Sequence, residues 1–484
     1  MLFNSFTFLL LFVLLVIIYY VMPHRFRWLL LLAASLSFYA TFNLGYVLLL
    51  VGAALVAFLA GLGMGTASVG RKRLVLALGV LAALAPLIVF KYFDFAVDSL
   101  NAILPGAEGA NALLPKLGWI LPAGLSFFTF ACVSYIVDVY QGKLPAERHF
   151  GRLLLYVAFF PKLLMGPIER ATSYLPQLAR EVHLSPENVT AGLQLILWGL
   201  FKKVVIADRL AIIVNAAYNR PQLANSVDLL IATYFFAFQI YCDFSGYSDI
   251  AIGLARILGF NLMLNFRRPY LATSIVEFWG KDRWHISLNK WFRDYMYFPL
   301  GGSRVPWWRY YFNLLAVFAV SGLWHGANWT FAIWGLLNGV YQVITIATAG
   351  IRNRIAQTIH MPHTLGSLLS GLLTFHLVLV SWVFFRASSF EDAQAVYTKV
   401  WTALPNLGSM LATLPNKPNY DEIVLSVGLI VVLMLIELLD EHRGLWEGLR
   451  TRPRVVRWAF YYALLAALVI FGKWGLAQFV YMQF

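Results

Sequence analysis

The residues best suited to chemistry lie between Phe278 and Gly335. Two histidines stand in this stretch: His285 in the sequence RWHIS and His325 in the sequence SGLWHGANW. His325 has apolar residues on both sides, and an ionisable group in such a run is costly to bury, which marks a candidate functional site. Imidazole, with an unperturbed pKa of about 6.5, is the usual general base. The sequence therefore predicts a buried histidine base; a core histidine bonded to a backbone carbonyl is the alternative.

The surroundings of His285 are basic and aromatic. They suit a helix at the headgroup level of a membrane, and equally a site where cations hold the phosphates of a nucleotide-like donor. Charged residues that could contact a substrate there are Arg283, Arg293 and Asp294. Trp324 and Asn328 flank His325 and are candidates for lining a tunnel.

A second group of polar residues interrupts an apolar run in the sequence YCDFSGYSD. Asp243, Ser245 and Tyr247 in this group either line a tunnel or mark a helix break with satisfied hydroxyls. The sequence contains no GxSxG, P-loop or HExxH motif, so a serine hydrolase, a P-loop ATPase and a zincin are unsupported. The two cysteines form no CxxC pair, and we expect neither a metal site nor a bound cofactor.

Composition places the chain among polytopic membrane proteins. Of its 484 residues, 60% are hydrophobic and 12% are charged, with a mean hydropathy of +0.71; soluble domains are about 25% charged. The net charge of +14 comes from basic residues dispersed between apolar runs. This pattern is typical of cytoplasmic loops and anionic lipid contacts, and we expect membrane lipid and no nucleic acid as partner.

The apolar runs predict an all-α bundle of about 11–13 spans with re-entrant or interfacial helices. We read 2–22 as a retained span, and the basic loops at 25–27 and 71–73 as cytoplasmic, which places the N-terminus outside. Two further spans are expected between these loops, joined by a turn near 43–45, and 401–421 is expected to be a loop. The later spans are predicted at 74–90, 119–140, 153–166, 190–213, 229–258, 310–324, 327–350, 366–385, 422–439 and 458–480.

Several segments in order along the chain resemble the membrane-bound O-acyltransferase (MBOAT) superfamily, and within it the AlgI-like branch of bacterial alginate O-acetylation proteins. The most specific segments are LPAGLSFFTFACVSYIVDVYQG at 121–142, FFPKLLMGPIER at 159–170, GLFKKVVIADRLA at 199–211 and SGLWHGANWTFAIWG at 321–335. The similarity covers nearly the whole length. One departure is Asn338, where the family often has histidine.

The resemblance implies one MBOAT domain over 1–484, with a catalytic core at about 119–387, that encloses a funnel or tunnel. It assigns the catalytic role to His325 and a second role in catalysis to His285. It further implies an acetyl thioester donor, acetyl-CoA, that enters from the cytoplasm. The acceptor system would be periplasmic, with SGNH-type acetyltransferases as partners, alginate as the polymer and the bacterial inner membrane as the location.

Other functions remain open. Acetylation of cellulose or another polymer, and D-alanyl transfer to teichoic acid, fit the same fold. A proton-coupled transporter without chemistry would use His325 for proton coupling, and a noncatalytic scaffold would not need His325 at all. A transferase consumes a thioester donor, whereas a transporter moves an unmodified substrate.

Overall fold

The computed structural model describes residues 2–65, 68–104, 114–444, 448–449, 451–475 and 479. Within these ranges the regular structure is helical and contains no strand. Eight of the described helices are long and apolar enough to cross a membrane, and two shorter apolar helices accompany them, Phe6–Val21 and Leu125–Tyr140. The prediction of an all-α polytopic membrane protein is confirmed.

The helices form two compact units. Unit 1 comprises residues 1–196, 250–264 and 293–295, and unit 2 comprises residues 197–249, 265–292 and 296–484. The long helices α10 (Pro186–Leu200) and α12 (Ser226–Ile257) supply residues to both. The single domain over 1–484 stays a prediction.

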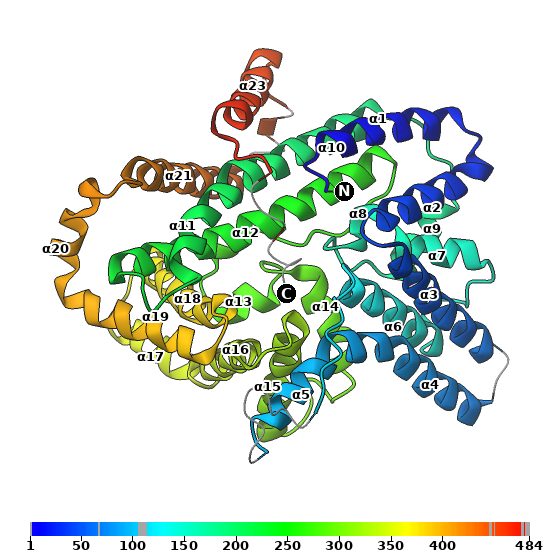
Figure 1. The fold of residues 1–484 in the computed structure, drawn as a ribbon, viewed down its shortest axis with the longest axis horizontal. Coiled ribbons are helices and arrows are strands. Elements are labelled where there is room, and N and C mark those ends of the chain that lie inside the picture. Colours follow the sequence, from blue (N-terminus) through cyan, green and yellow to red (C-terminus); the bar gives the residue numbers. More distant parts are fainter. Residues whose placement is uncertain are drawn as a thin grey trace. The chain divides into compact units, whose positions relative to one another are not determined.

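Unit 1 is built mainly from the N-terminal helices. Within it α3, α4 and α6 pack against one another (Figure 1). A Cβ on Gly61 would lie 2.7 Å from the Tyr135 hydroxyl, and one on Gly79 would lie 2.8 Å from the Ala60 Cβ, so small residues let these helices approach closely. The elements of unit 1 are α1 (Phe6–Val21), α2 (His24–Ala40), α3 (Leu44–Met64), α4 (Val69–Leu87), η1 (Ile88–Tyr92), α5 (Phe93–Asn101), α6 (Leu125–Tyr140), α7 (Phe150–Ala158), α8 (Phe160–Leu163) and α9 (Ala171–Leu178).

Two predicted spans of unit 1 differ from the structure. The helix expected from residue 119 begins at Leu125, because Gly124 has a left-handed backbone (φ 80°) that only glycine adopts readily. The span expected at 153–166 is wrong: α7 ends at Ala158, and the extended backbone at Phe159 separates it from α8. Pro161 lies in the first turn of α8, where its missing N–H costs nothing.

Unit 2 contains the sequence stretch with the two histidines. Side-chain caps begin three of its helices: Ser274 accepts from the Glu277 amide, Asn328 from Thr330 and Ser389 from Asp392. α15 and α16 pack side by side (Figure 1). Its elements are η3 (Phe201–Ala207), α11 (Asp208–Tyr218), η4 (Pro269–Leu271), α13 (Ile275–Gly280), α14 (Ile286–Phe292), α15 (Trp307–His325), α16 (Trp329–Ala347), α17 (Ala349–Thr358), α18 (His363–Arg386), α19 (Phe390–Ala403), η6 (Leu404–Asn406), α20 (Leu407–Ala412), η7 (Leu414–Asn416), α21 (Tyr420–Arg443) and α23 (Arg454–Phe471). The π-helical η5 (Arg293–Tyr297) contributes its residues 293–295 to unit 1 and the rest to unit 2.

Short helices do occur in the middle of the chain, as expected, but the polar residues of α12 do not break it. α12 runs unbroken for 32 residues through Asp243 and Asp249. The irregular backbone lies instead at η3, a π-helical segment that includes Lys202 and Lys203. The loop expected at 401–421 is partly wrong, because α20 and two 3₁₀ turns occupy much of it.

Candidate functional site

His325 is the last residue of α15. The helix ends there because Gly326 adopts an extended backbone and Asn328 then caps α16, so the histidine sits at a tight junction between two packed helices. Only 3% of His325 is exposed. A Cβ at Gly326 would lie 2.2 Å from the Phe331 ring, which requires glycine at this position.

His285 lies in the short connection between α13 and α14, outside the candidate membrane-spanning helices. It is fully buried, and its backbone is left-handed (φ 42°). The Phe244 ring of α12 meets the imidazole edge-on at 4.7 Å, and the Phe266 ring is stacked at 6.3 Å.

The structure brings the two histidines together within unit 2. Their ring centroids are 5.9 Å apart, and Trp324 is next to both, 5.0 Å from His325 and 5.9 Å from His285. Further buried aromatic rings lie against the pair. They are Trp334 and Phe385 against His325, backed by Trp284 and Trp382.

This environment keeps His285 neutral. Burial lowers the pKa of His285 to about 3, because a low-dielectric surrounding disfavours the charged imidazolium. A neutral imidazole can accept a proton from a hydroxyl or hold a hydrogen bond to a reactant. The aromatic enclosure also limits the access of water to the two rings.

The polar residues of α12 form ion pairs with η3. Lys203 Nζ lies 2.6 Å from Asp243 Oδ1 and 2.7 Å from Asp208 Oδ1. Lys202 Nζ lies 2.7 Å from Asp249 Oδ2 and donates to Ser245 Oγ at 2.9 Å. Charge neutralisation therefore explains how these residues are tolerated in apolar helices.

Asp243 and Ser245, predicted to line a tunnel, thus have structural partners, and Tyr247 packs edge-on against Phe479 at 5.0 Å. In the sequence, Lys202 and Lys203 interrupt an apolar run. The pairing could have been anticipated, because buried lysines need acids within reach and α12 supplies them.

The other predicted site residues are placed as follows. Arg283 forms ion pairs with Glu277 at 2.7 Å and Glu441 at 3.0 Å. Arg293 and Asp294 belong to unit 1, where Asp294 faces Arg170 at 3.6 Å. The structure therefore groups Arg283 in the same unit as the two histidines.

Asn328 is the N-cap of α16 and also donates to the Ser388 carbonyl at 3.1 Å. Asn338, the departure from the family pattern, is fully buried and accepts a hydrogen bond from Trp279 Nε1 at 3.1 Å while donating to the Trp334 carbonyl at 2.8 Å. Since Trp334 contacts His325, Asn338 supports the aromatic wall of the pair.

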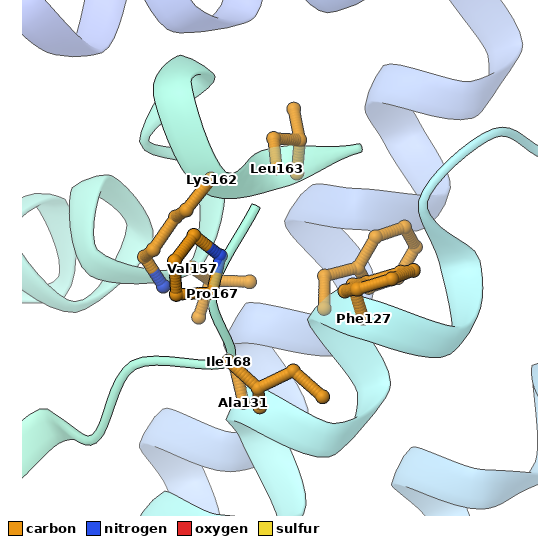
Figure 2. A pocket seen from close by; sticks show the side chains of 8 residues that line it. Phe127, Ala131, Val157, Lys162, Leu163, Pro167 and Ile168 are labelled. Atoms are coloured by element: carbon orange, nitrogen blue, oxygen red, sulfur yellow. The ribbon is translucent and has the colours of Figure 1, made fainter. Parts of the chain in front are cut away.

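Unit 1 has a small buried cavity of its own, of about 10 Å³, which is room for about one water molecule. Figure 2 shows Lys162 beside Val157 and Pro167 in its wall, with Phe127 across from them. Lys162 Nζ lies 4.2 Å from the Tyr156 ring centroid, and burial lowers its pKa to about 8. The cavity is too small for a donor or acceptor.

Among the residues that the structure describes, no cluster of three or more histidine, cysteine, aspartate or glutamate side chains could hold a metal ion. The arrangement does offer two buried imidazoles, groups that can take up and release a proton.

Comparison with known proteins identifies the class. Residues 144–389 match the MBOAT, membrane-bound O-acyltransferase family, and the chain belongs to this family. It is a multi-pass membrane protein and an acyltransferase.

Three relatives indicate the range of acceptors in the family. "Probable alginate O-acetylase AlgI" of Azotobacter vinelandii is 38% identical over 83% of this chain and 78% of its own length. "Peptidoglycan O-acetyltransferase" of Helicobacter pylori is 36% identical over 76% of this chain and 72% of its own. "Teichoic acid D-alanyltransferase" of Bacillus subtilis is 30% identical, over 45% of this chain and 57% of its own.

Proposed function

We propose that this protein transfers acetyl groups from a thioester donor, acetyl-CoA, towards the O-acetylation of an exopolysaccharide, with alginate as the polymer. The observation that carries the proposal is the pair of buried imidazoles, 5.9 Å apart, inside an aromatic enclosure of an O-acyltransferase. The similarity to relatives named as alginate O-acetylases supports the choice of acetyl group and polymer.

His325 acts as the general base in this reaction. It takes the proton of the acceptor hydroxyl as the oxygen attacks the thioester carbonyl, so that a C–O bond forms and the C–S bond breaks. The proton then passes to the departing thiolate, and the transfer is balanced without a further reactant. His285 orients or polarises one reactant across the 5.9 Å that separates the rings.

The donor enters from the cytoplasm and the acceptor from the periplasm. The basic residues at 25–27 and 71–73, which lie in the first turns of α2 and α4 and not in the loops expected from the sequence, support this orientation, because positive residues at the ends of spans are retained in the cytoplasm. The protein then resides in the bacterial inner membrane with its N-terminus outside. Periplasmic SGNH-type acetyltransferases complete the transfer to the polymer.

The test is polymer O-acetylation in cells that carry His325→Ala, normalised to the membrane level of the variant. Removal of a general base lowers a rate by about 10²–10⁴-fold, so we expect the acetyl ester content to fall to background. The matched control is His376→Ala, which removes a histidine of α18 that is bonded to Tyr234 and to the Leu372 carbonyl. Wild-type acetylation by His325→Ala would overturn the catalytic assignment.

The acceptor and acyl group can be separated from the chemistry. If alginate carries no acetyl ester in the wild type, the names of the relatives direct attention to peptidoglycan O-acetylation and to D-alanyl transfer. His325→Ala should then abolish whichever of these modifications the wild type carries. Mass spectrometry of cell-wall and secreted polymers from wild-type and deletion strains distinguishes these cases.

A further inference from the structure

Residues 265–267 run alongside residues 283–287 in unit 2 and fix the backbone on both sides of His285. The Ile286 amide donates to the Asn265 carbonyl at 2.9 Å, and the Arg267 amide donates to the Arg283 carbonyl at 2.9 Å. His285 therefore occupies a point between two backbone hydrogen bonds to one neighbouring segment.

The chain near His285 is held against its conformational preferences. His285 has a φ of 42°, and Arg268 (45°) and Asp282 (58°) share this left-handed region, in which a Cβ crowds the following carbonyl. Among the described residues, these are three of the four non-glycine positions with positive φ. Such conformations persist where the surrounding contacts over-determine them, and they cluster at functional sites.

The side chain of Asn265 adds hydrogen bonds to Ser287 beyond those made by the backbone. It is 1% exposed, and its Oδ1 accepts from the Ser287 amide at 3.3 Å and from Ser287 Oγ at 2.9 Å. The first amides of a helix have no partner within the helix, so Asn265 satisfies one in the first turn of α14.

Asn265 also ties this turn to α12. Its Nδ2 donates to Ser248 Oγ at 3.2 Å, and α12 is the helix whose Phe244 ring lies edge-on to the imidazole of His285. The adjacent Phe266 ring stacks on the same imidazole. Asn265 thus connects the backbone next to His285 with the elements that carry the aromatic rings around its imidazole.

We propose that Asn265 is the positioning residue of His285: it holds the first turn of α14 against α12, so that His285 keeps its left-handed backbone and its ring stays beside His325. The inference rests on the proposed role of His285 in acyl transfer. Without the Oδ1 acceptor, the backbone of His285 relaxes towards negative φ, and its imidazole moves away from His325.

The experiment measures the initial rate of acetyl transfer from acetyl-CoA into polymer, in membranes that contain the full chain and its polysaccharide system, at several donor concentrations. For Asn265→Ala we expect kcat per folded molecule to fall at least about tenfold with KM for the donor nearly unchanged, because small misplacements of a catalytic group are costly. Asn265→Asp keeps the acceptor for Ser287 and should recover activity to within a few fold of wild type.

Asn313→Ala is the matched control. Asn313 is also a fully buried asparagine of unit 2, twelve residues before His325 in the sequence, and it donates to the Leu300 carbonyl at 3.2 Å and the Gly302 carbonyl at 3.1 Å. It should lower protein abundance without lowering kcat per folded molecule. If Asn265→Ala does not accumulate, Ser287→Ala, which removes the 2.9 Å bond alone, should still lower kcat by a few fold.

An unchanged kcat for both Asn265→Ala and Ser287→Ala, or a failure of Asn265→Asp to recover, would overturn the proposal. His285→Ala is measured in parallel. If it retains wild-type activity, the proposed role of His285 fails; if it is inactive while the Asn265 and Ser287 variants turn over normally, only the positioning role fails.

Discussion

At the residue scale, the addition of a single methyl group at Gly326 should displace the residues of the site. A Cβ there would lie 2.2 Å from the Phe331 ring, directly after His325. Gly326→Ala should therefore push Phe331 and His325 apart and lower acetyl transfer about tenfold or more, since a displacement of about 1 Å can cost about 100-fold. Initial rates per folded molecule check this.

Two further variants make that result specific. Gly326→Ala combined with Phe331→Ala removes the clashing ring and should regain part of the lost rate. Gly350→Ala, where an added Cβ meets nothing within 4 Å, should behave as wild type. A double variant no better than Gly326→Ala alone would contradict the steric explanation.

His285 should contribute nothing to the pH dependence of activity in the physiological range. Its pKa is lowered by burial to about 3, so the folded protein holds the neutral ring throughout pH 5–8, and only below that pKa does it take up a proton. His285→Gln, which cannot titrate, should lower the rate but leave the shape of the pH–rate profile between pH 5 and 8 unchanged. A profile limb that disappears in this variant would show that His285 titrates there.

Individual residues show what the sequence could predict of the site. His325 and His285 were predicted from their residue type and apolar or aromatic flanks, and the structure places them side by side. The aromatic wall, in which Trp382 comes from 57 residues beyond His325, depends on helix packing that no local pattern encodes. The roles of Asn265 and Asn338 depend on hydrogen bonds to residues on other elements, such as Ser287 and Trp279, which the sequence alone does not pair with them.

At the scale of the element, the ion pairs between η3 and α12 are the contacts most sensitive to charge. Lys203 is paired with two buried acids, Asp208 and Asp243. Lys203→Met leaves both carboxylates without their cation, and breaking a buried pair costs about 3–5 kcal/mol. We expect a marked loss of folded protein, measured as thermal stability after extraction in mild detergent.

The compensating variant tests this directly. Lys203→Met with Asp208→Asn and Asp243→Asn removes all three charges, and replacement of a complete buried group by neutral residues is often tolerated. Its stability should exceed that of Lys203→Met alone. A triple variant less stable than the single one would show that hydrogen bonds outweigh charge at this place.

Two segments show where local sequence patterns predicted a structure that differs from the one observed. Charged residues in α12 predicted a possible break, but partners on η3 neutralise them and the helix continues. The apolar run at 153–166 predicted a span, but Pro161 and the extended Phe159 divide it into two short buried helices. Hydropathy records how apolar a segment is, and does not separate lipid-facing from protein-buried segments.

At the scale of the whole molecule, the orientation in the membrane can be tested by cysteine labelling. The two natural cysteines, Cys132 and Cys242, are buried, so background labelling should be low. Lys116 lies beyond the candidate span Val69–Asn101, so the proposed orientation places it outside, and Lys116→Cys should react with a membrane-impermeant maleimide in intact spheroplasts. Arg73→Cys should react only after permeabilisation. The reverse pattern would invert the proposed topology and the entry sides of donor and acceptor.

The fold class was predictable because composition and run length alone distinguish a polytopic membrane protein from a soluble one. The family followed from several motifs in a fixed order, and the match to 144–389 confirms it. The division into two compact units was not predicted, because it depends on which helices pack together, and both α10 and α12 contribute to each unit.

The aromatic enclosure of the histidines has an optical consequence. Of the chain's 16 tryptophans, Trp334 and Trp382 are stacked at 5.6 Å with their planes 17° apart, and Trp284 lies 4.9 Å from Trp382. Indoles at such spacing couple excitonically, so the near-ultraviolet circular dichroism of the native protein should contain a couplet that Trp382→Phe removes. Trp334 also contacts His325. A reactant that binds there and separates these rings should therefore change the intrinsic tryptophan fluorescence.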